Sequence, residues 1–271
     1  MARFPRTSPV PMLLRLIPLA ALSILVVGCS APRKTLSLSA APLTLSGEFG
    51  ASAGAATVNS TVDELGLGDE ELGFYPRFDA DWDDSHFSIG WLGTAYEGTG
   101  VVSGDVTIDG STIPSGTTVD TRMDLAALTA LYTWDIVPIG PADLGIGLGV
   151  TLLDIDLEMI SQADSTRLQS DEILPLPVLT ARLDFRDSPF AVGASVGGID
   201  VSFDEGAARV LDLDVHARLR FSTGISGGGM SAHFLGGYRS FSADGHYDDG
   251  ATQVDADVRM AGPYLGLSIS F

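Results

Sequence analysis

The chain has 271 residues, with 35 acidic against 15 basic side chains, a formal net charge of −20 and a single cysteine. One cysteine excludes a disulfide framework and a multi-cysteine metal site. The acidic balance argues against nucleic acid as a partner, because a phosphate backbone requires clustered Lys and Arg. Hydrophobic residues nevertheless make up 45% of the chain, so the fold must hold many acids and much apolar surface together.

Residues 1–28 predict a signal peptide, because three arginines precede an apolar run, 16–27, that is too short to span a membrane as a helix. The end of this segment, Val26-Val27-Gly28-Cys29, resembles the lipobox of bacterial lipoproteins, in which cleavage precedes a cysteine that receives lipid. We therefore predict lipidation at Cys29, with loss of Cys29 by ordinary cleavage as the alternative. Residues 29–43 are predicted to form a tether without sustained periodicity.

From residue 44 onward, apolar and polar side chains alternate with a period of two, the pattern of strands rather than of spanning helices. The clearest case is 210–222, where Leu211, Leu213 and Val215 point one way and the charged side chains between them point the other. Ten strands are predicted, with eight as the alternative. Their ranges are 44–55, 72–82, 86–108, 117–136, 144–158, 172–185, 190–203, 208–221, 230–242 and 254–271.

Two local features interrupt this regular pattern. Within 144–158 the apolar phase shifts by one residue between Leu152 and Leu153, which predicts a β-bulge. Residues 60–65 (Ser-Thr-Val-Asp-Glu-Leu) predict a capped helical turn in the first loop.

Three features favour a transmembrane barrel over a soluble sandwich. Short and long connections largely alternate along the chain, aromatic residues lie mostly toward strand ends, and an alternating last strand closes on Phe271. With the signal peptide, these features resemble the small outer-membrane β-barrel superfamily of the OmpA, OmpW and OmpX type. The resemblance implies a closed antiparallel up-and-down barrel over 44–271 in the bacterial outer membrane. Its partners would be outer-membrane lipid and, through Phe271, the barrel-assembly machinery; the oligomeric state stays open.

A barrel of this size holds its polar row in the lumen, where charges must be paired or solvated. The predicted lumen network is Arg77, Asp79, Asp81, Asp120, Arg122, Asp124, Arg182, Asp184, Asp212, Asp214, His216, Arg218 and Arg220. The chain is therefore predicted to be a non-enzymatic envelope protein, with either a filled lumen or a narrow passive pore.

Two other function classes stay open as alternatives. Some outer-membrane barrels modify lipid A with a His and a Ser, and here His233 and Ser231 share one strand face. A lipid-anchored periplasmic β-barrel that binds ligands is the second alternative. The sequence contains no nucleotide-binding or hydrolase motif, and we predict no catalytic residues, no metal site and no cofactor.

Overall fold

The computed structural model describes residues 32–53, 56–108, 111–139, 142–187, 190–203, 206–221, 230–248 and 252–271. The predicted signal peptide and Cys29 lie outside the described residues. Residues from Arg33 to Phe271 belong to one unit. No helix in the described ranges is long and apolar enough to cross a membrane.

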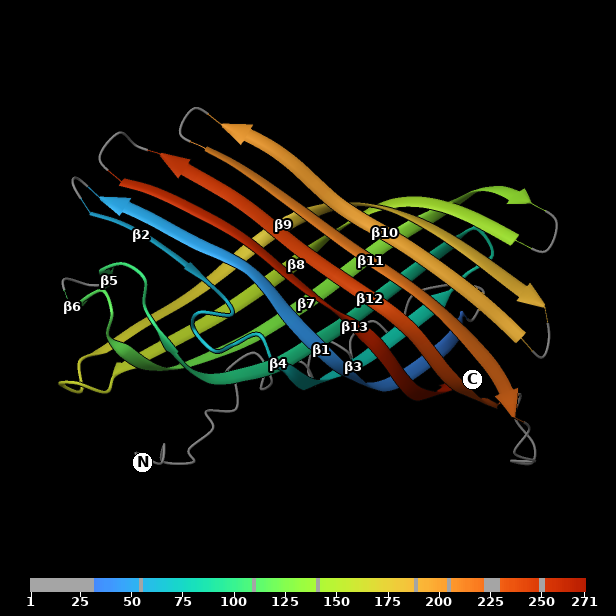
Figure 1. Cartoon of the computed structure of the whole chain (residues 1–271). Coiled ribbons are helices and arrows are strands. Elements are labelled where there is room, and N and C mark those ends of the chain that lie inside the picture. The colour runs from blue at the N-terminus through green and yellow to red at the C-terminus, as the bar shows by residue number, and fades with distance from the viewer. Residues whose placement is uncertain are drawn as a thin grey trace. The chain divides into compact units, whose positions relative to one another are not determined.

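An antiparallel sheet closes on itself to form the wall of a barrel (Figure 1). Eleven strands belong to it. β2 takes the place of β3 beside the last residues of β1, so ten strands make up the ring. These ten are β1 (Arg33–Ala53), β3 (Glu70–Asp81), β4 (Ser85–Val101), β7 (Thr118–Ile139), β8 (Ala142–Ser161), β9 (Arg167–Asp187), β10 (Phe190–Phe203), β11 (Gly206–Phe221), β12 (Ser231–Asp248) and β13 (Thr252–Ser270). Closure comes from β13 pairing with β1, from Thr35↔Ser270 to Ala53↔Thr252. The predicted ten-stranded up-and-down barrel is confirmed.

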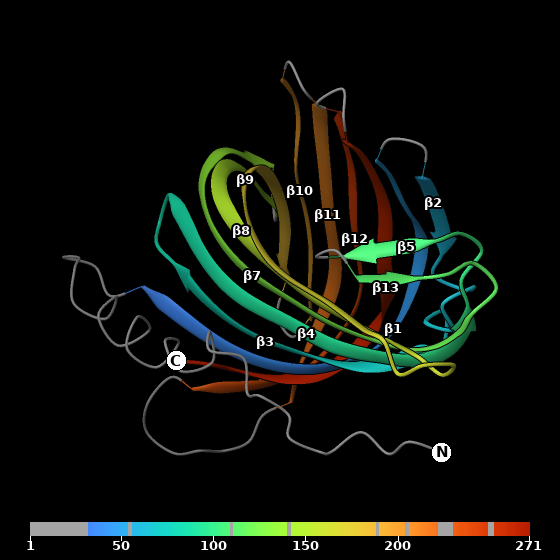
Figure 2. The ribbon, with the colours of Figure 1, turned by 90° about the vertical axis from the view of Figure 1, so that its left-hand side faces the viewer.

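The two ends of the barrel differ in their connections. We call the end that holds Arg33 and Phe271 the proximal end, and the opposite end the distal end. Proximal connections span 82–84, 140–141, 188–189 and 222–230, and distal ones 54–69, 102–117, 162–166, 204–205 and 249–251. The two longest distal connections contain β2 (Ala56–Thr61) and the hairpin of β5 (Val106–Ile108) and β6 (Ser111–Ile113), which Figure 2 shows at the distal mouth. The expected sorting of loop lengths therefore holds only in part, because several strands themselves extend far distally.

The first strand begins earlier than predicted. It starts at Arg33, so residues 33–43 belong to the barrel wall, and their assignment to a tether is wrong. Along this stretch Leu36 and Leu38 are 54% and 60% exposed. The inward residues are the buried hydroxyls Thr35, Ser37 and Ser39. The alternation is less evident in the sequence because hydroxyls replace charges and the inward row turns apolar at Ala41.

The barrel wall reverses its polarity partway along its length. In the proximal half the outer face is an apolar belt, whose exposed members include Leu148, Leu179, Leu213, Val215, Leu219, Leu265 and Leu267. In the distal half the inward side chains are apolar and buried, among them Leu43, Leu45, Met123, Leu125, Leu153, Phe241 and Met260. We use "apolar belt" and "distal core" for these two sets. The first is the pattern of a wall facing lipid, and the second is that of a water-soluble barrel.

The predicted β-bulge at Leu152 and Leu153 does not occur. Pairing between β7 and β8 runs without interruption through Leu128↔Leu152 and Ala127↔Leu153, and the register shift between these strands lies at Asp135/Val137. The phase shift in the sequence instead marks the change of polarity. Leu153 is buried in the distal core, and the outward residues that follow are Asp154, Asp156 and Glu158.

A short insert completes the wall where β3 is too short to do so. Beyond Thr44↔Glu70 the strand β1 pairs with β2 instead of β3. The turn that follows bonds to the free edge of β4, where the Val101 N–H donates to the Glu64 carbonyl at 3.0 Å. Inside this turn the Thr61 N–H donates to the Glu64 carboxylate at 3.0 Å, and the Glu64 N–H donates to the Thr61 hydroxyl at 3.1 Å. This is the predicted capped turn.

Glycines on β4 permit this close approach of two backbones. A Cβ at Gly100 would lie 1.9 Å from the Glu64 carbonyl oxygen, and one at Gly98 would lie 1.9 Å from that of Gly66. We expect Gly100→Ala to displace the turn, and the amide of Val101 to exchange with solvent at least about tenfold faster. Gly245→Ala is the control, because a Cβ there meets nothing within 4 Å. Unchanged Val101 exchange in Gly100→Ala would contradict this account.

Candidate functional site

The structure divides the thirteen predicted lumen residues into three groups. Nine lie on the inward face of the wall: Arg77, Asp79, Asp81, Arg182, Asp184, Asp212, Asp214, His216 and Arg218. Arg220 follows in the same row but is exposed at the proximal rim. The remaining three are Asp120, Arg122 and Asp124, and their placement in the lumen is wrong.

These three residues lie on the outer face of the distal half. Their neighbours on β7 take the inward positions, with Val119 and Met123 at most 1% exposed. Arg122 pairs with Glu97 at 2.9 Å and with Asp124 at 3.1 Å, and the side chains of these partners are 54% and 36% exposed. A single inward face for the whole strand would place these charges in the lumen, whereas the distal core has the apolar row inside.

In a first cluster, charges from β3, β4, β7 and β9 pair with one another. The Arg77 Nε lies 2.8 Å from Asp79, and His86 contacts Asp81 through Nδ1 at 2.7 Å and Asp79 through Nε2 at 3.2 Å. Arg182 pairs with Asp184 and lies 2.8 Å from Asp135. It also lies 3.6 Å from Asp81 on β3, four strands away around the ring. This last ion pair therefore crosses the bore.

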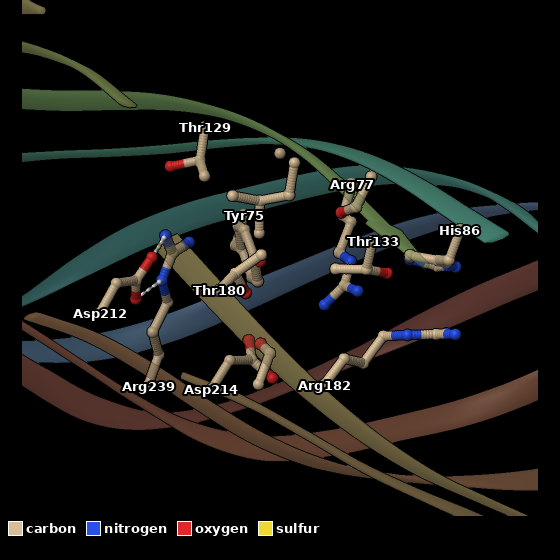
Figure 3. A pocket seen from close by; sticks show the side chains of 14 residues that line it. Tyr75, Arg77, His86, Thr129, Thr133, Thr180, Arg182, Asp212, Asp214 and Arg239 are labelled. Carbon is tan, nitrogen blue, oxygen red and sulfur yellow. Dashed lines mark hydrogen bonds and ion pairs between the residues drawn. The ribbon is translucent and has the colours of Figure 1, made fainter. Parts of the chain in front are cut away.

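In a second cluster, charges from β11 and β12 meet two tyrosines, of which Figure 3 shows Tyr75. Arg239 donates two hydrogen bonds to Asp212, at 2.7 and 3.0 Å, and its guanidinium lies 4.5 Å from the centre of the Tyr75 ring. The Tyr264 hydroxyl donates to Asp214 at 3.0 Å, and the Asp214 carboxylate also contacts His216 Nδ1 at 2.9 Å. Together with the first cluster, these groups form what we call the charged layer.

Five members of the charged layer were not predicted from the sequence: Tyr75, His86, Asp135, Arg239 and Tyr264. The phase of β12 offered a signal, because Arg239 lies an even number of residues after His233 and so shares its inward face. Phase gave the same signal for Tyr75, two positions before Arg77, and for Tyr264, opposite the row of Leu265 and Leu267, but their residue type pointed elsewhere. An aromatic residue near a strand end is expected in an interfacial girdle, whereas Tyr75 and Tyr264 face inward and stack edge to face at 5.8 Å.

Little space remains between these side chains. The cavity drawn in Figure 3 has a volume of about 30 Å³, and a second one between Asp79, His216 and Tyr264 has about 10 Å³. A single water needs about 10–15 Å³, so the first cavity admits two or three waters and the second at most one. The charged layer leaves no room here for a solute.

The structure places Ser231 and His233, the alternative catalytic pair, next to each other, but among the described residues the histidine lacks a third group that would orient it. Ser231 Oγ lies 3.4 Å from His233 Nε2, but the buried His233 Nδ1 has no hydrogen-bond partner in the described chain. A histidine that activates a hydroxyl is normally oriented by a third group at its other nitrogen. In addition, no group of three or more His, Cys, Asp or Glu side chains among the described residues is placed to hold a metal ion.

No protein-family model and no curated protein matches this sequence. Among solved structures, the outer membrane protease OmpT from Escherichia coli is similar with a TM-score of 0.53 and 8% identity, over 91% of this chain and 99% of that one. Neisserial surface protein A matches with a TM-score of 0.32 and 11% identity, over 88% and 97% of the two chains. Ail of Yersinia pestis matches with a TM-score of 0.30 and 9% identity, over 85% and 98%.

The likeness to OmpT shows the fold: the chain has the fold of bacterial outer-membrane β-barrel proteins. The predicted fold class is confirmed, and the resemblance to outer-membrane barrels holds at the level of the fold.

Proposed function

We propose that the chain is a non-enzymatic outer-membrane barrel whose bore is closed, and that it carries its distal half beyond the membrane. The observation that carries this proposal is the charged layer, whose ion pair between Arg182 and Asp81 crosses the bore. A buried charge that loses its ion-pair partner is costly in free energy, so separating the charges of this layer is unfavourable. Of the two versions expected from the sequence, the filled lumen is therefore favoured over the narrow pore.

The reversal of polarity supports an orientation in the membrane. A transmembrane strand needs about 9–11 residues, whereas β7 has 22 and β8 has 20. The apolar belt lies in the proximal half, so we assign this half to the lipid and both chain ends of the barrel to the periplasmic side. Outer-membrane lipid and the barrel-assembly machinery are the proposed partners, and lipidation of Cys29 stays a prediction.

The enzyme and soluble-binder alternatives are less well supported. OmpT is named a protease, but the closest Asp–His contacts of this chain lie in the charged layer beside cavities too small for a peptide. A lipid-modifying pair at His233 lacks an orienting group. A soluble periplasmic binder would expose the apolar belt to water, which is unfavourable over so large a surface.

Conductance in planar bilayers tests the closed bore. We expect no conductance steps from the refolded wild-type protein at any salt concentration. The double variant Tyr75→Ala/Tyr264→Ala removes two large inward side chains from the charged layer, and it is expected to stay closed because the distal core still fills the bore. Heat-modifiable migration in detergent gels confirms that both proteins are folded. Reproducible steps from the wild type would contradict the proposal.

A further inference from the structure

The distal core contains a cavity that the closed bore does not explain. Its volume is about 170 Å³, more than five times that of the cavity in the charged layer. One wall comes from β7, β8 and β9 and includes Leu125 and Leu153, and the opposite wall from β11, β12 and β13 includes Val210, Phe241 and Met260. All five of these side chains are at most 7% exposed.

Protein interiors are packed densely, and voids much larger than a water molecule are few. Water does not fill such a void without two or more polar partners. The residues around this one are almost entirely apolar, and Asp244 is an exposed residue at its rim. This lining offers water few polar partners, so a molecule that fills the cavity gains dispersion contacts and leaves water at the same time.

The surroundings also define the size and charge of the occupant. An engineered apolar cavity of about 150 Å³ in another protein holds one benzene molecule, so about 170 Å³ fits one aromatic ring or a short alkyl chain. The next inward residues toward the proximal end are Asp212, two positions from Val210, and Arg239, two from Phe241. These two are already paired with each other, so the cavity offers no free charge to a charged ligand.

We propose that this cavity is a binding site for a small uncharged apolar molecule of that size. The site belongs to the distal half, so the proposal does not depend on whether the bore conducts. Access is from the distal side, where Asp244 and Gly245 form the rim.

Methionine methyl groups provide the test, because the methionines among the described residues lie in different surroundings. Met260 lines the cavity, whereas Met230 is 42% exposed. In the full barrel, labelled with ¹³C at its methionine methyls and held in detergent micelles, we expect benzene to shift the Met260 signal saturably. The Met230 signal should change only in proportion to benzene in the micelle. Met260→Leu assigns the signal.

A matched pair of substitutions separates the cavity from the lipid-facing surface. Ala127 lines the cavity, and Ala130 lies on the opposite face of the same strand. We expect Ala127→Leu to fill part of the space and weaken benzene binding at least about tenfold, while Ala130→Leu leaves it unchanged. Should Ala127→Leu fail to fold, Ala243→Leu fills the cavity from β12 instead. The proposal is overturned if Met260 responds like Met230, or if neither cavity-filling variant weakens the response.

Discussion

Replacing Arg239 with alanine is expected to lower the free energy of unfolding by about 3–5 kcal/mol, because it leaves the Asp212 carboxylate buried without its partner. The Arg239 side chain is 5% exposed and that of Asp212 is 16% exposed. The substitution also removes the contact of the guanidinium with the Tyr75 ring. Urea unfolding from lipid vesicles, followed by fluorescence of the three tryptophans, measures the loss.

Arg122→Ala is the control for this experiment. Arg122 also pairs with two carboxylates, but its side chain is 27% exposed on the distal outer face. Such pairs contribute at most about 1 kcal/mol. Equal losses for the two variants would show that the charged layer does not stabilise the barrel.

The second large effect is expected at the apolar belt. Leu265 is 76% exposed on the outer face of β13, and an arginine in its place would lie against lipid. We expect Leu265→Arg to cost about 2–4 kcal/mol, as cations near the bilayer midplane do in membrane barrels. Unfolding from vesicles in urea again measures the change.

The matched control lies on the same face of the same strand. Asp257 precedes Leu265 by eight positions, toward the distal end, and is exposed. Asp257→Arg is expected to change the free energy of unfolding by no more than about 0.5 kcal/mol, as for an ordinary surface substitution. If both variants lose stability equally, or neither does, the assignment of the lipid boundary is wrong.

The wall of the barrel could be predicted because alternation depends only on the geometry of an extended chain. The stretch 210–222 gave the correct facing for Leu213, Val215 and Asp214, which the structure places at 37%, 42% and 4% exposure. Alternation does not say which face is inward, however. The prediction that charges face inward along the whole wall is wrong for Asp120, Arg122 and Asp124, because apolar residues fill the distal core.

The charged layer could be predicted only as a set of candidates. Its pairs join residues far apart in the sequence, such as Arg182 with Asp81, and register between distant strands cannot be read from either strand alone. Tyr264 illustrates a further difficulty. Its role depends on the hydroxyl reaching Asp214 two strands away, which no local pattern contains.

The polarity reversal occurs within strand pairings that continue through it, so hydrogen bonds join the two halves of the wall directly. On β7, residues 118–124 lie beyond the last belt positions, and about seven residues at about 3.3 Å each, tilted by about 45°, rise about 16 Å. The proximal half, which we assign to the membrane, therefore supports the distal half as a continuation of the same strands. In this arrangement the distal connections lie at a set distance from the bilayer, given by the length of the distal strands.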